Sequence, residues 1–375
     1  MERIVIVSGD FVRTGGMDMP NFAVAQHLAD RGVSVQLVAF RVAEELAKNV
    51  NVHWHRVPKP LRSYFLGLPL LDHVGRNVAR KCLDRGGRAI VNGGNCLVGD
   101  VNWVHYVHAA YQAPPSASRV RHAQHALTHR LNLELERSSL SKARTIIANS
   151  ERTRRDLTER LGIDDSDIRT VYYGIDPELF SAPSDERRRR LREQFGLPDR
   201  PQVAFVGALA DRRKGFDTLF AAWSSLCRDR SWDCDLVVVG RGAELALWRQ
   251  RAQDEGLPER IRFLGFRSDV PDVIAACDAL VAPTRYEAYG LGVQEALCTG
   301  LPALVSASAG VAERYPAELA ELLLDDPNDA VELEANLRNW RRHHERLRDT
   351  TRGLSAQLRQ RTWQVMAEDV RLLLD

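Results

Sequence analysis

The first forty residues alternate between short apolar runs and a polar turn that contains glycine. Arg3–Val7 is a run of mostly β-branched apolar residues, which predicts a buried strand. Apolar residues at helical spacing follow over Asn21–Arg31, and Gly32 is placed to cap that helix. Ser34–Phe40 again has the pattern of a strand. This order of strand, glycine turn, helix and strand predicts a βαβ unit with parallel strands.

The same plan returns about 200 residues later along the chain. Gln202–Val206 and Asp235–Val239 have strand patterns, and a polar turn and a helix over Phe216–Leu226 lie between them. We therefore expect an α/β protein with two Rossmann-like, doubly wound domains that face each other across a cleft. The charged stretch Ser181–Pro201 predicts an exposed helix and a linker between them.

The expected domain limits follow from the positions of these two βαβ units. We expect residues 1–185 to form the first domain and residues 186–355 to form the second. Residues 356–375 carry an amphipathic pattern around Trp363 and Met366, which predicts a final helix.

Composition narrows the class of protein. The 375 residues are 44% hydrophobic and 27% charged, typical of a soluble globular chain. The six cysteines form no C-x-x-C pair, which favours reduced, buried thiols and a cytoplasmic location. No signal peptide pattern and no run of about 18 apolar residues is present.

The net charge of +2 is too mild for a nucleic-acid-binding protein. The first 180 residues hold 24 basic and 19 acidic residues, a balance of +5, and the remainder holds 28 and 31, a balance of −3. This distribution is compatible with anionic small ligands or with an acidic membrane surface. The oligomeric state is not indicated by the sequence.

The stretch from Ala282 to Pro302 carries the most chemical information. It leads from a strand-like run through a turn at Tyr289-Gly290-Leu291 into a helix that Gly300 caps. A helix start offers unpaired backbone N–H groups and the positive end of the helix dipole, which suit a diphosphate. Gly290 lets the backbone approach such a ligand closely.

Glu287 and Glu295 lie eight residues apart in this stretch, which resembles the E-x7-E signature of the retaining GT-B glycosyltransferases of family 4. The resemblance extends along most of the chain. The other segments that agree with it in order and spacing are Gly15-Gly16, Asn149-Ser150, Val171–Gly174, Phe205–Gly207, Arg213–Gly215, Val239–Gly242, Phe263–Gly265 and Ala276–Asp278.

The resemblance implies that residues 1–185 lie on the acceptor side, that residues 186–355 hold the nucleotide sugar, and that the helix over residues 356–375 crosses back to the first domain. It also implies roles for particular positions. Glu287 would contact the transferred sugar, Glu295 the nucleotide ribose, and Arg213 and Lys214 the departing diphosphate. Gly16 would face the diphosphate from the first domain, and Phe266–Asp269 would edge the base pocket. The donor-binding set implied in this way is Gly15, Gly16, Gly207, Gly240, Arg267, Tyr289, Gly290, Leu291 and Glu295.

Lys214 has support that does not depend on the resemblance. Only five of the 52 basic residues are lysines, yet one of them lies in the proposed phosphate loop. A lysine is a compact point charge, which a planar arginine does not replace. Many relatives carry arginine after the first glycine of this loop, where this chain has Ala208; either one phosphate contact is missing or Arg212 or Arg213 compensates.

Two histidines are candidates for the wall of the sugar pocket. Alternation over Trp103–Tyr111 predicts the end of a strand, with His105 and His108 on opposite faces. The resemblance favours His108 as the catalytic histidine, with His105 as the alternative. A histidine in an apolar strand is otherwise a hydrogen-bonded core residue. No paired-Asp motif for a divalent cation stands out, so no metal and no cofactor beyond the donor are expected.

Within Leu61–Lys81, six aromatic or leucine residues lie between basic ones: Tyr64, Phe65, Leu66, Leu68, Leu70 and Leu71. The pattern predicts a core helix of the first domain, with weak peripheral contact at the inner face of a membrane, or with a lipid-linked substrate, as the alternative.

Taken with the resemblance, these features predict a retaining, metal-independent hexosyltransferase of glycan, glycoconjugate or polysaccharide biosynthesis. Its partners would be a UDP- or GDP-sugar and a hydroxyl acceptor, which is a glycan, a lipid-linked sugar or a small molecule. The sequence leaves uracil, guanine and adenine open. The alternatives are a sugar-nucleotide epimerase or phosphorylase on the same fold, and a catalytically silent sugar-nucleotide-binding subunit.

Overall fold

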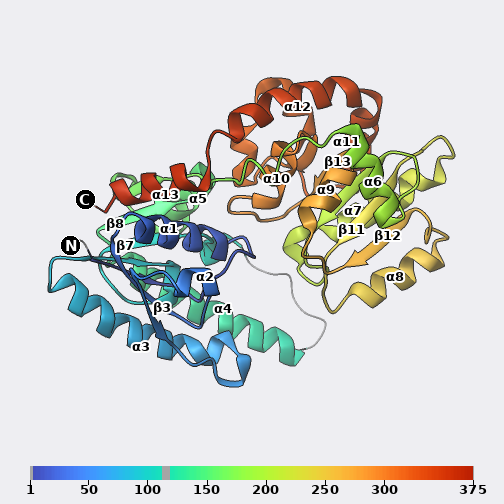
Figure 1. The fold of residues 1–375 in the computed structure, drawn as a ribbon. Helices are drawn as coiled ribbons and strands as arrows, with labels where there is room; N and C mark the ends of the chain where they lie inside the picture. The colour runs from blue at the N-terminus through green and yellow to red at the C-terminus, as the bar shows by residue number, and fades with distance from the viewer. Residues whose placement is uncertain (1–2, 112–118, 375) are drawn as a thin grey trace. The chain divides into compact units, whose positions relative to one another are not determined.

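The computed structural model describes residues 3–111 and 119–374, with side chains for 3–111 and 127–374 (Figure 1). The chain divides into two compact units. Unit 1 comprises Met1–Gly174 together with Arg361–Asp375, and unit 2 comprises Ile175–Gln360.

Unit 1 is built on a seven-stranded sheet in the order β5-β3-β1-β6-β7-β8-β9, in which every pairing is parallel. Its strands are β1 (Arg3–Val7), β3 (Ser34–Ala39), β5 (Val52–Arg56), β6 (Arg88–Val91), β7 (Val101–Val104), β8 (Thr145–Ala148) and β9 (Ile168–Thr170). A separate short pair joins β2 (Asp10–Phe11) to β4 (Arg41–Val42).

The helices of unit 1 include one from the C-terminal end of the chain. They are α1 (Asp18–Asp30), α2 (Glu44–Ala47), α3 (Tyr64–Leu83), α4 (Arg119–Leu140), α5 (Glu151–Leu161) and α13 (Trp363–Leu372). The last helix, α13, packs beside α1, where His27 Nε2 lies 2.9 Å from Glu368 Oε2 (Figure 1). The first helix begins at Asp18, earlier than the sequence pattern predicts, since Pro20 is tolerated in a first helical turn.

Unit 2 holds a second parallel sheet in the order β12-β11-β10-β13-β14-β15. Its strands are β10 (Gln202–Val206), β11 (Asp235–Val239), β12 (Ile261–Gly265), β13 (Ala279–Ala282), β14 (Ala303–Ser306) and β15 (Leu323–Leu324). Its helices are α6 (Asp185–Phe195), α7 (Phe216–Arg228), α8 (Leu245–Asp254), α9 (Val270–Ala276), α10 (Leu291–Cys298), α11 (Ala330–Arg342) and α12 (His344–Leu358).

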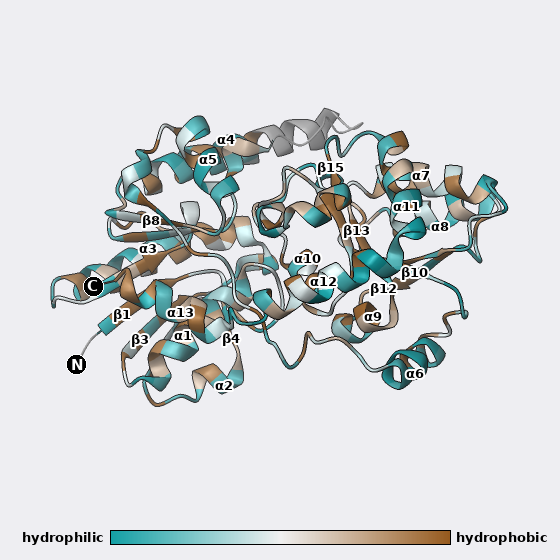
Figure 2. Cartoon of the chain, turned by 90° about the horizontal axis from the view of Figure 1, so that it is seen from above, coloured by the Kyte–Doolittle hydropathy of each residue, from teal (hydrophilic) through white to brown (hydrophobic). Residues whose placement is uncertain are grey.

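The predicted strands form because their side chains are buried on both faces, as parallel sheets covered by helices require. Every residue of β11 is buried, and β13 is among the most hydrophobic segments of Figure 2. The charged helix α6 is hydrophilic in the same view, but it is not only a solvated face. Arg188 and Arg192 lie 3.1 and 2.5 Å from the carboxylate of Asp278, so part of the charge run anchors α6 to unit 2.

Six cysteines remain as free thiols, and all but Cys227 are buried. None of the described helices is long and apolar enough to cross a lipid bilayer.

Candidate functional site

The predicted donor residues of unit 2 lie in loops at one edge of its sheet, because parallel strands place all their carboxyl ends together. The loops after β10, β11 and β12 are joined directly through their backbones. Gly207 N donates to Val239 O at 2.9 Å, and Gly240 N donates to Gly265 O at 2.8 Å. This edge is therefore one continuous surface rather than a set of separate loops.

Two glycines permit that close approach. A Cβ at Gly240, where φ is +153°, would lie 1.8 Å from the carbonyl oxygen of Gly207. A Cβ at Gly215, where φ is +68°, would lie 1.9 Å from the carbonyl oxygen of Pro283. Gly207 and Gly240, expected from the sequence to bind the donor, thus already have a packing role against each other.

The structure brings two predicted residues together. Lys214 ends the short 3-10 helix Arg212–Lys214, and Glu287 lies between β13 and α10. Lys214 Nζ donates to Glu287 Oε2 at 2.5 Å, with 28% and 23% of the two side chains exposed. The ammonium and the carboxylate therefore neutralise each other at a position that solvent reaches.

Arg213 directly precedes Lys214 in the chain, but its side chain binds a different carboxylate. Its guanidinium donates to both carboxylate oxygens of Asp211, with Nη2 at 2.6 Å from Oδ2. Arg212 is also engaged, at 3.3 Å from Asp217 and from Glu244. Both guanidiniums therefore lie against carboxylates in this structure.

Arg285 lies in the stretch from Ala282 to Pro302, where the sequence indicates no role for it, and the structure gives it one. Its backbone N donates to Arg213 O at 2.7 Å, and its Nη1 donates to Arg212 O at 2.6 Å. The same guanidinium binds Asp217 at 2.8 Å. Arg285 thus ties the basic loop to the segment that carries Glu287. The only sequence signal was a charged residue two positions before that glutamate.

The turn before α10 presents a helix start to the same edge. Gly290 has φ +113° and its carbonyl accepts from the N–H groups of Val293 and Gln294. Within the described residues, the N–H groups of Leu291 and Gly292 have no acceptor. Tyr289 is buried, and its hydroxyl binds Gln294. The turn therefore offers amides and not the Tyr289 side chain.

Glu295 lies inside α10. Its side chain is partly exposed, but the protein around the carboxylate removes enough water to raise the pKa of Glu295 to about 8. At neutral pH this carboxyl is mostly protonated in the unliganded protein.

Arg267 is held by a carboxylate of its own loop and lies against helix α6. Its guanidinium makes two hydrogen bonds to Asp269, at 2.6 and 2.5 Å, and lies 5.0 Å from the ring of Phe195 in α6. The preceding residue, Phe266, exposes 66% of its surface.

The two candidate histidines of unit 1 have different surroundings. Strand β7 ends at Val104, before both of them, so the expected alternation on one strand does not hold. His105 is buried, with Nδ1 2.5 Å from Tyr173 Oη and Nε2 3.0 Å from Asn92 Nδ2. Burial lowers the pKa of His105 to about 3. These contacts are those of a hydrogen-bonded core histidine.

His108 instead begins the 3-10 turn His108–Ala110. Glu136 of α4 fixes this turn: its carboxylate accepts from the backbone N–H of His108 at 2.8 Å and of Ala109 at 3.3 Å. Burial raises the pKa of Glu136 to about 7, although these hydrogen bonds oppose the shift. Two amides that bind one buried carboxylate explain why the chain leaves the strand pattern here.

The first glycine loop also lies in unit 1, ahead of α1. Gly15 has φ +106°, and a Cβ at Gly16 would meet no atom within 4 Å. Asp18 follows at the helix start, where burial and then the charge of Asp10 raise the pKa of Asp18 to about 6. The structure therefore leaves open space at Gly16.

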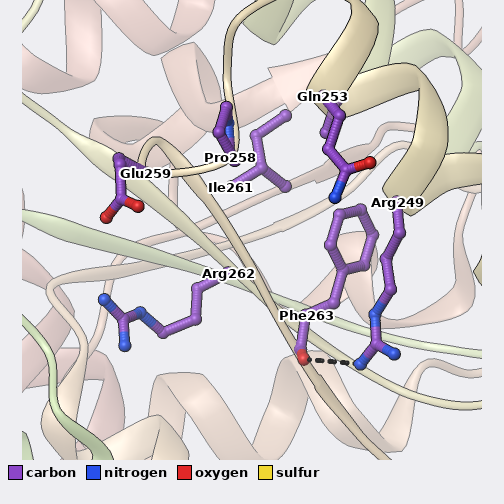
Figure 3. Close-up of a pocket in the computed structure, with 8 residues that line it drawn as sticks. Arg249, Gln253, Pro258, Glu259, Ile261, Arg262 and Phe263 are labelled. Atoms are coloured by element: carbon purple, nitrogen blue, oxygen red, sulfur yellow. Dashed lines mark hydrogen bonds between the residues drawn. The ribbon is translucent and has the colours of Figure 1, made fainter.

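A separate pocket of about 320 Å³ lies between α8 and β12 (Figure 3). Arg249, Gln253, Glu259 and Phe263 line it, and Arg249 Nη2 donates to the carbonyl oxygen of Phe263 at 3.2 Å. None of the predicted site residues lines this pocket, so its volume says nothing about the donor site.

Two family descriptions match the chain. Glycosyl transferases group 1 matches residues 187–352, and Glycosyltransferase Family 4 matches residues 14–179. The second description thus covers most of unit 1, and the first covers most of unit 2.

Curated relatives agree with these matches. The chain is 29% identical over 210 residues to alpha-D-kanosaminyltransferase of Streptomyces kanamyceticus, covering 51% of this chain and 54% of the relative. It is 30% identical over 253 residues to 2-deoxystreptamine glucosyltransferase of the same organism, covering 62% of each. The chain thus spans little more than half the length of these relatives.

Solved structures show the same fold over the whole chain. Sucrose-phosphate synthase from Thermosynechococcus elongatus has a TM-score of 0.77 at 22% identity, and the match covers 100% of this chain and 98% of that one. HepE of Anabaena in complex with UDP-glucose has a TM-score of 0.75 at 19% identity, covering 100% and 99%.

Proposed function

Because the chain belongs to the family 4 glycosyltransferases, with the GT-B fold, we propose that it transfers a sugar from a nucleotide-diphosphate donor to a hydroxyl acceptor. The transfer retains the configuration at the anomeric carbon. The observation that carries this proposal is the convergence of Lys214, Glu287 and the start of α10 at one edge of unit 2.

The chemistry follows from where charge develops. The leaving diphosphate gains negative charge while the sugar becomes oxocarbenium-like, so fixed cations and helix-end amides lower the barrier. Lys214 and the N–H groups of Leu291 and Gly292 suit the diphosphate. Glu287 suits the positive sugar, and its ion pair with Lys214 must rearrange when the donor binds.

The proposed mechanism uses the leaving group as a base. A phosphate oxygen takes the acceptor's proton, so attack comes from the face that the diphosphate leaves. A double displacement would need a carboxylate nucleophile next to the anomeric carbon, and Glu287 is the candidate among the described residues of this edge. Lys214 and the helix start supply the charge that a metal supplies in other transferases, which supports metal-independent transfer.

The donor in this proposal is a UDP- or GDP-hexose. HepE of Anabaena, which shares the fold, is solved in complex with UDP-glucose. The acceptor is a hydroxyl of a glycan, a lipid-linked sugar or a small molecule, and the product belongs to glycan or glycoconjugate biosynthesis. His108, held by Glu136, and the loop at Gly15 and Gly16 would contribute from unit 1.

The test uses radiolabelled UDP- and GDP-hexoses with a panel of glycan, lipid-linked and small-molecule acceptors. We expect label to move to an acceptor with retained anomeric configuration, read by NMR of the product. Incubation of the donor alone separates the alternatives, since an epimerase would change it and a transferase would at most hydrolyse it slowly. Nucleotide binding without transfer to any acceptor would instead favour a silent binding subunit.

We also propose peripheral contact with an anionic membrane for unit 1. Helix α3 packs Gly67, Leu71 and Gly75 inward, as a core helix does. The start of this helix and the 3-10 turn Pro60–Arg62 before it are exposed, however: Leu61 in the turn is 90% and Phe65 52% exposed, and Tyr64, Leu66 and Leu70 are also exposed. Between residues 56 and 81 the chain holds six basic residues and one acidic residue.

The prediction is salt-sensitive binding to vesicles that contain phosphatidylglycerol, without binding to pure phosphatidylcholine. The double substitution Phe65→Ser and Leu66→Ser should weaken vesicle binding by about tenfold or more, since each removes exposed apolar surface from the contact. Leu247→Ser, which alters an exposed leucine in unit 2, is the matched control. Equal sedimentation of all three proteins with anionic vesicles would contradict the contact.

A further inference from the structure

A group of polar side chains of both charges lies at the carboxyl edge of the sheet of unit 1. Asp10 comes shortly after β1, Lys59 after β5 and Asn95 after β6. Asp18 begins α1, and Tyr64 begins α3. Because open α/β sheets bind ligands outside the carboxyl ends of their strands, this edge is where unit 1 can hold a small molecule.

The ring of Tyr64 joins three of the loops at this edge. A Cβ at Gly9 would lie 3.0 Å from a carbon of the ring, so the loop after β1 touches it directly. The hydroxyl of Tyr64 donates to Oδ1 of Asn95 at 2.6 Å, and the ammonium of Lys59 lies 5.5 Å from the centroid of the ring. The loops after β1, β5 and β6 therefore meet around one aromatic side chain.

Three polar groups at this edge have no polar partner among the residues that the structure describes. The amide nitrogen of Asn95 has no acceptor, while its oxygen is used by Tyr64. The ammonium of Lys59 has no carboxylate partner and lies over the rings of Phe40 and Tyr64, at 5.1 and 5.5 Å. The carboxylate of Asp18 accepts no hydrogen bond and caps no backbone N–H of α1.

The carboxylate of Asp18 is poorly stabilised by the protein. Burial, followed by the charge of Asp10, raises the pKa of Asp18 to about 6, while the charges of Arg41 and Lys59 oppose the shift. Asp18 and Lys59 thus act on each other electrostatically, but they form no ion pair. A ligand that donates to Asp18 would supply the hydrogen bonds that this carboxylate lacks.

The balance of charge limits the class of that ligand. Arg41 Nη2 lies 2.6 Å from Asp10 Oδ2, so these two charges offset each other and leave Asp18 and Lys59 as opposite charges. A phosphate would be attracted by Lys59 but repelled by Asp18, and an ammonium the reverse. A hydroxyl both donates and accepts, so neighbouring hydroxyls on an uncharged ring suit both groups as well as the amide of Asn95.

We propose that Asp18, Lys59 and Asn95 select the acceptor and that they take an uncharged, hydroxyl-rich ring, as in a polyol or an unphosphorylated glycan. This inference rests on the proposed function and names the acceptor class together with the side chains that choose it. Asp18 accepts hydrogen bonds from the ring hydroxyls, and Lys59 and Asn95 donate to them. Tyr64 is a positioning residue, because it holds both donors.

The first experiment compares the Michaelis constants of acceptor and donor, using the acceptor that the transfer panel identifies. Asp18→Ala and Lys59→Met should each raise the acceptor KM by about tenfold or more, the usual cost of losing a hydrogen bond to a charged group, and leave the donor KM unchanged. Tyr64→Phe should raise the acceptor KM less, because it releases Asn95 but keeps a ring beneath Lys59. A general loss of structure would not separate the two constants.

A second experiment tests the acceptor class. The acceptor is compared with analogues that carry a phosphate or an amine in place of a hydroxyl that does not react. The unmodified protein should use the uncharged form best, with kcat/KM higher by at least about tenfold, because each charged analogue faces a like charge. Asp18→Asn should narrow the preference over the phosphorylated analogue, and Lys59→Met the preference over the amine.

Two matched controls lie on the same helices, away from this edge. Asp30→Ala alters the end of α1 and Lys81→Met the end of α3, and both should leave the two Michaelis constants unchanged. An unchanged acceptor KM in Asp18→Ala or Lys59→Met, or an equal rise in the donor KM, overturns the assignment while transfer by the unmodified protein still supports the proposed function. Preference for a charged analogue overturns the class. Absence of transfer to every acceptor counts against both proposals.

Discussion

Lys214→Ala should lower the turnover number by about a hundredfold or more, the typical cost of removing one group that stabilises developing charge. The reason is that Lys214 is the cation placed directly against Glu287, 2.5 Å away, at the edge where the start of α10 offers its amides. Lys214→Arg should recover only part of the loss, since a planar fork does not replace a point charge. Steady-state transfer with a saturating donor measures the effect.

The matched control for this experiment is Lys142→Ala, which removes an exposed lysine from unit 1 and should leave turnover unchanged. Because Lys214→Ala also leaves Glu287 without its partner, the double variant Lys214→Ala with Glu287→Gln belongs in the same series. If the two residues act as a unit, the double variant should be little worse than the worse single variant. Near-normal turnover of Lys214→Ala would remove its proposed role.

Donor affinity should rise steeply with pH between 6 and 8, through Glu295. Burial raises the pKa of this carboxyl to about 8, so it is protonated in the free protein at neutral pH. Ribose hydroxyls that donate to it favour the ionised form, and binding at pH 7 should therefore release about one proton. If only the ionised form binds, the affinity follows the ionised fraction of Glu295, which falls about fiftyfold between pH 8 and pH 6.

Calorimetry of UDP- or GDP-glucose binding in buffers of different ionisation enthalpy counts the protons directly. Glu295→Gln keeps the size of the side chain but cannot ionise, so it should abolish the proton release and flatten the pH profile. The variant should also be more stable than the unmodified protein, by an amount that grows as the pH rises from about 4.5 to 8 and then stays constant, because over that range the carboxyl ionises in the unfolded chain but stays protonated in the folded protein. A pH profile that is the same in both proteins would show that Glu295 does not contact the donor.

Much of the donor edge could be predicted from the sequence because its signals are local. A glycine turn after a β-branched run, a helix cap and a proline stop each depend on residues close in the chain. The strands β1, β10 and β11 have the predicted limits for this reason. The histidine segment could not be predicted in this way, since the turn at His108 depends on Glu136, 28 residues further along.

The ion-pair partners of the charged side chains also could not be predicted from local sequence patterns. The sequence places Arg213, Lys214 and Arg267 near phosphates or the base, but gives no sign that Asp211 and Asp269 engage the two arginines. It equally gives no sign that Arg285 ties the basic loop to the Glu287 segment. Such pairings depend on which side each residue of a turn faces, and a turn has no simple period from which to read it.

The sequence by itself determined the α/β class, the two parallel sheets and the family, because short-range patterns of burial and glycine placement repeat along the chain in a fixed order. Only the tertiary structure decided which predicted groups meet. The Lys214–Glu287 pair, the raised pKa of Glu295 and the exposed ring of Phe266 all arise between segments far apart in the chain. Electrostatics and burial are set by distance in space, and the order of residues does not contain those distances.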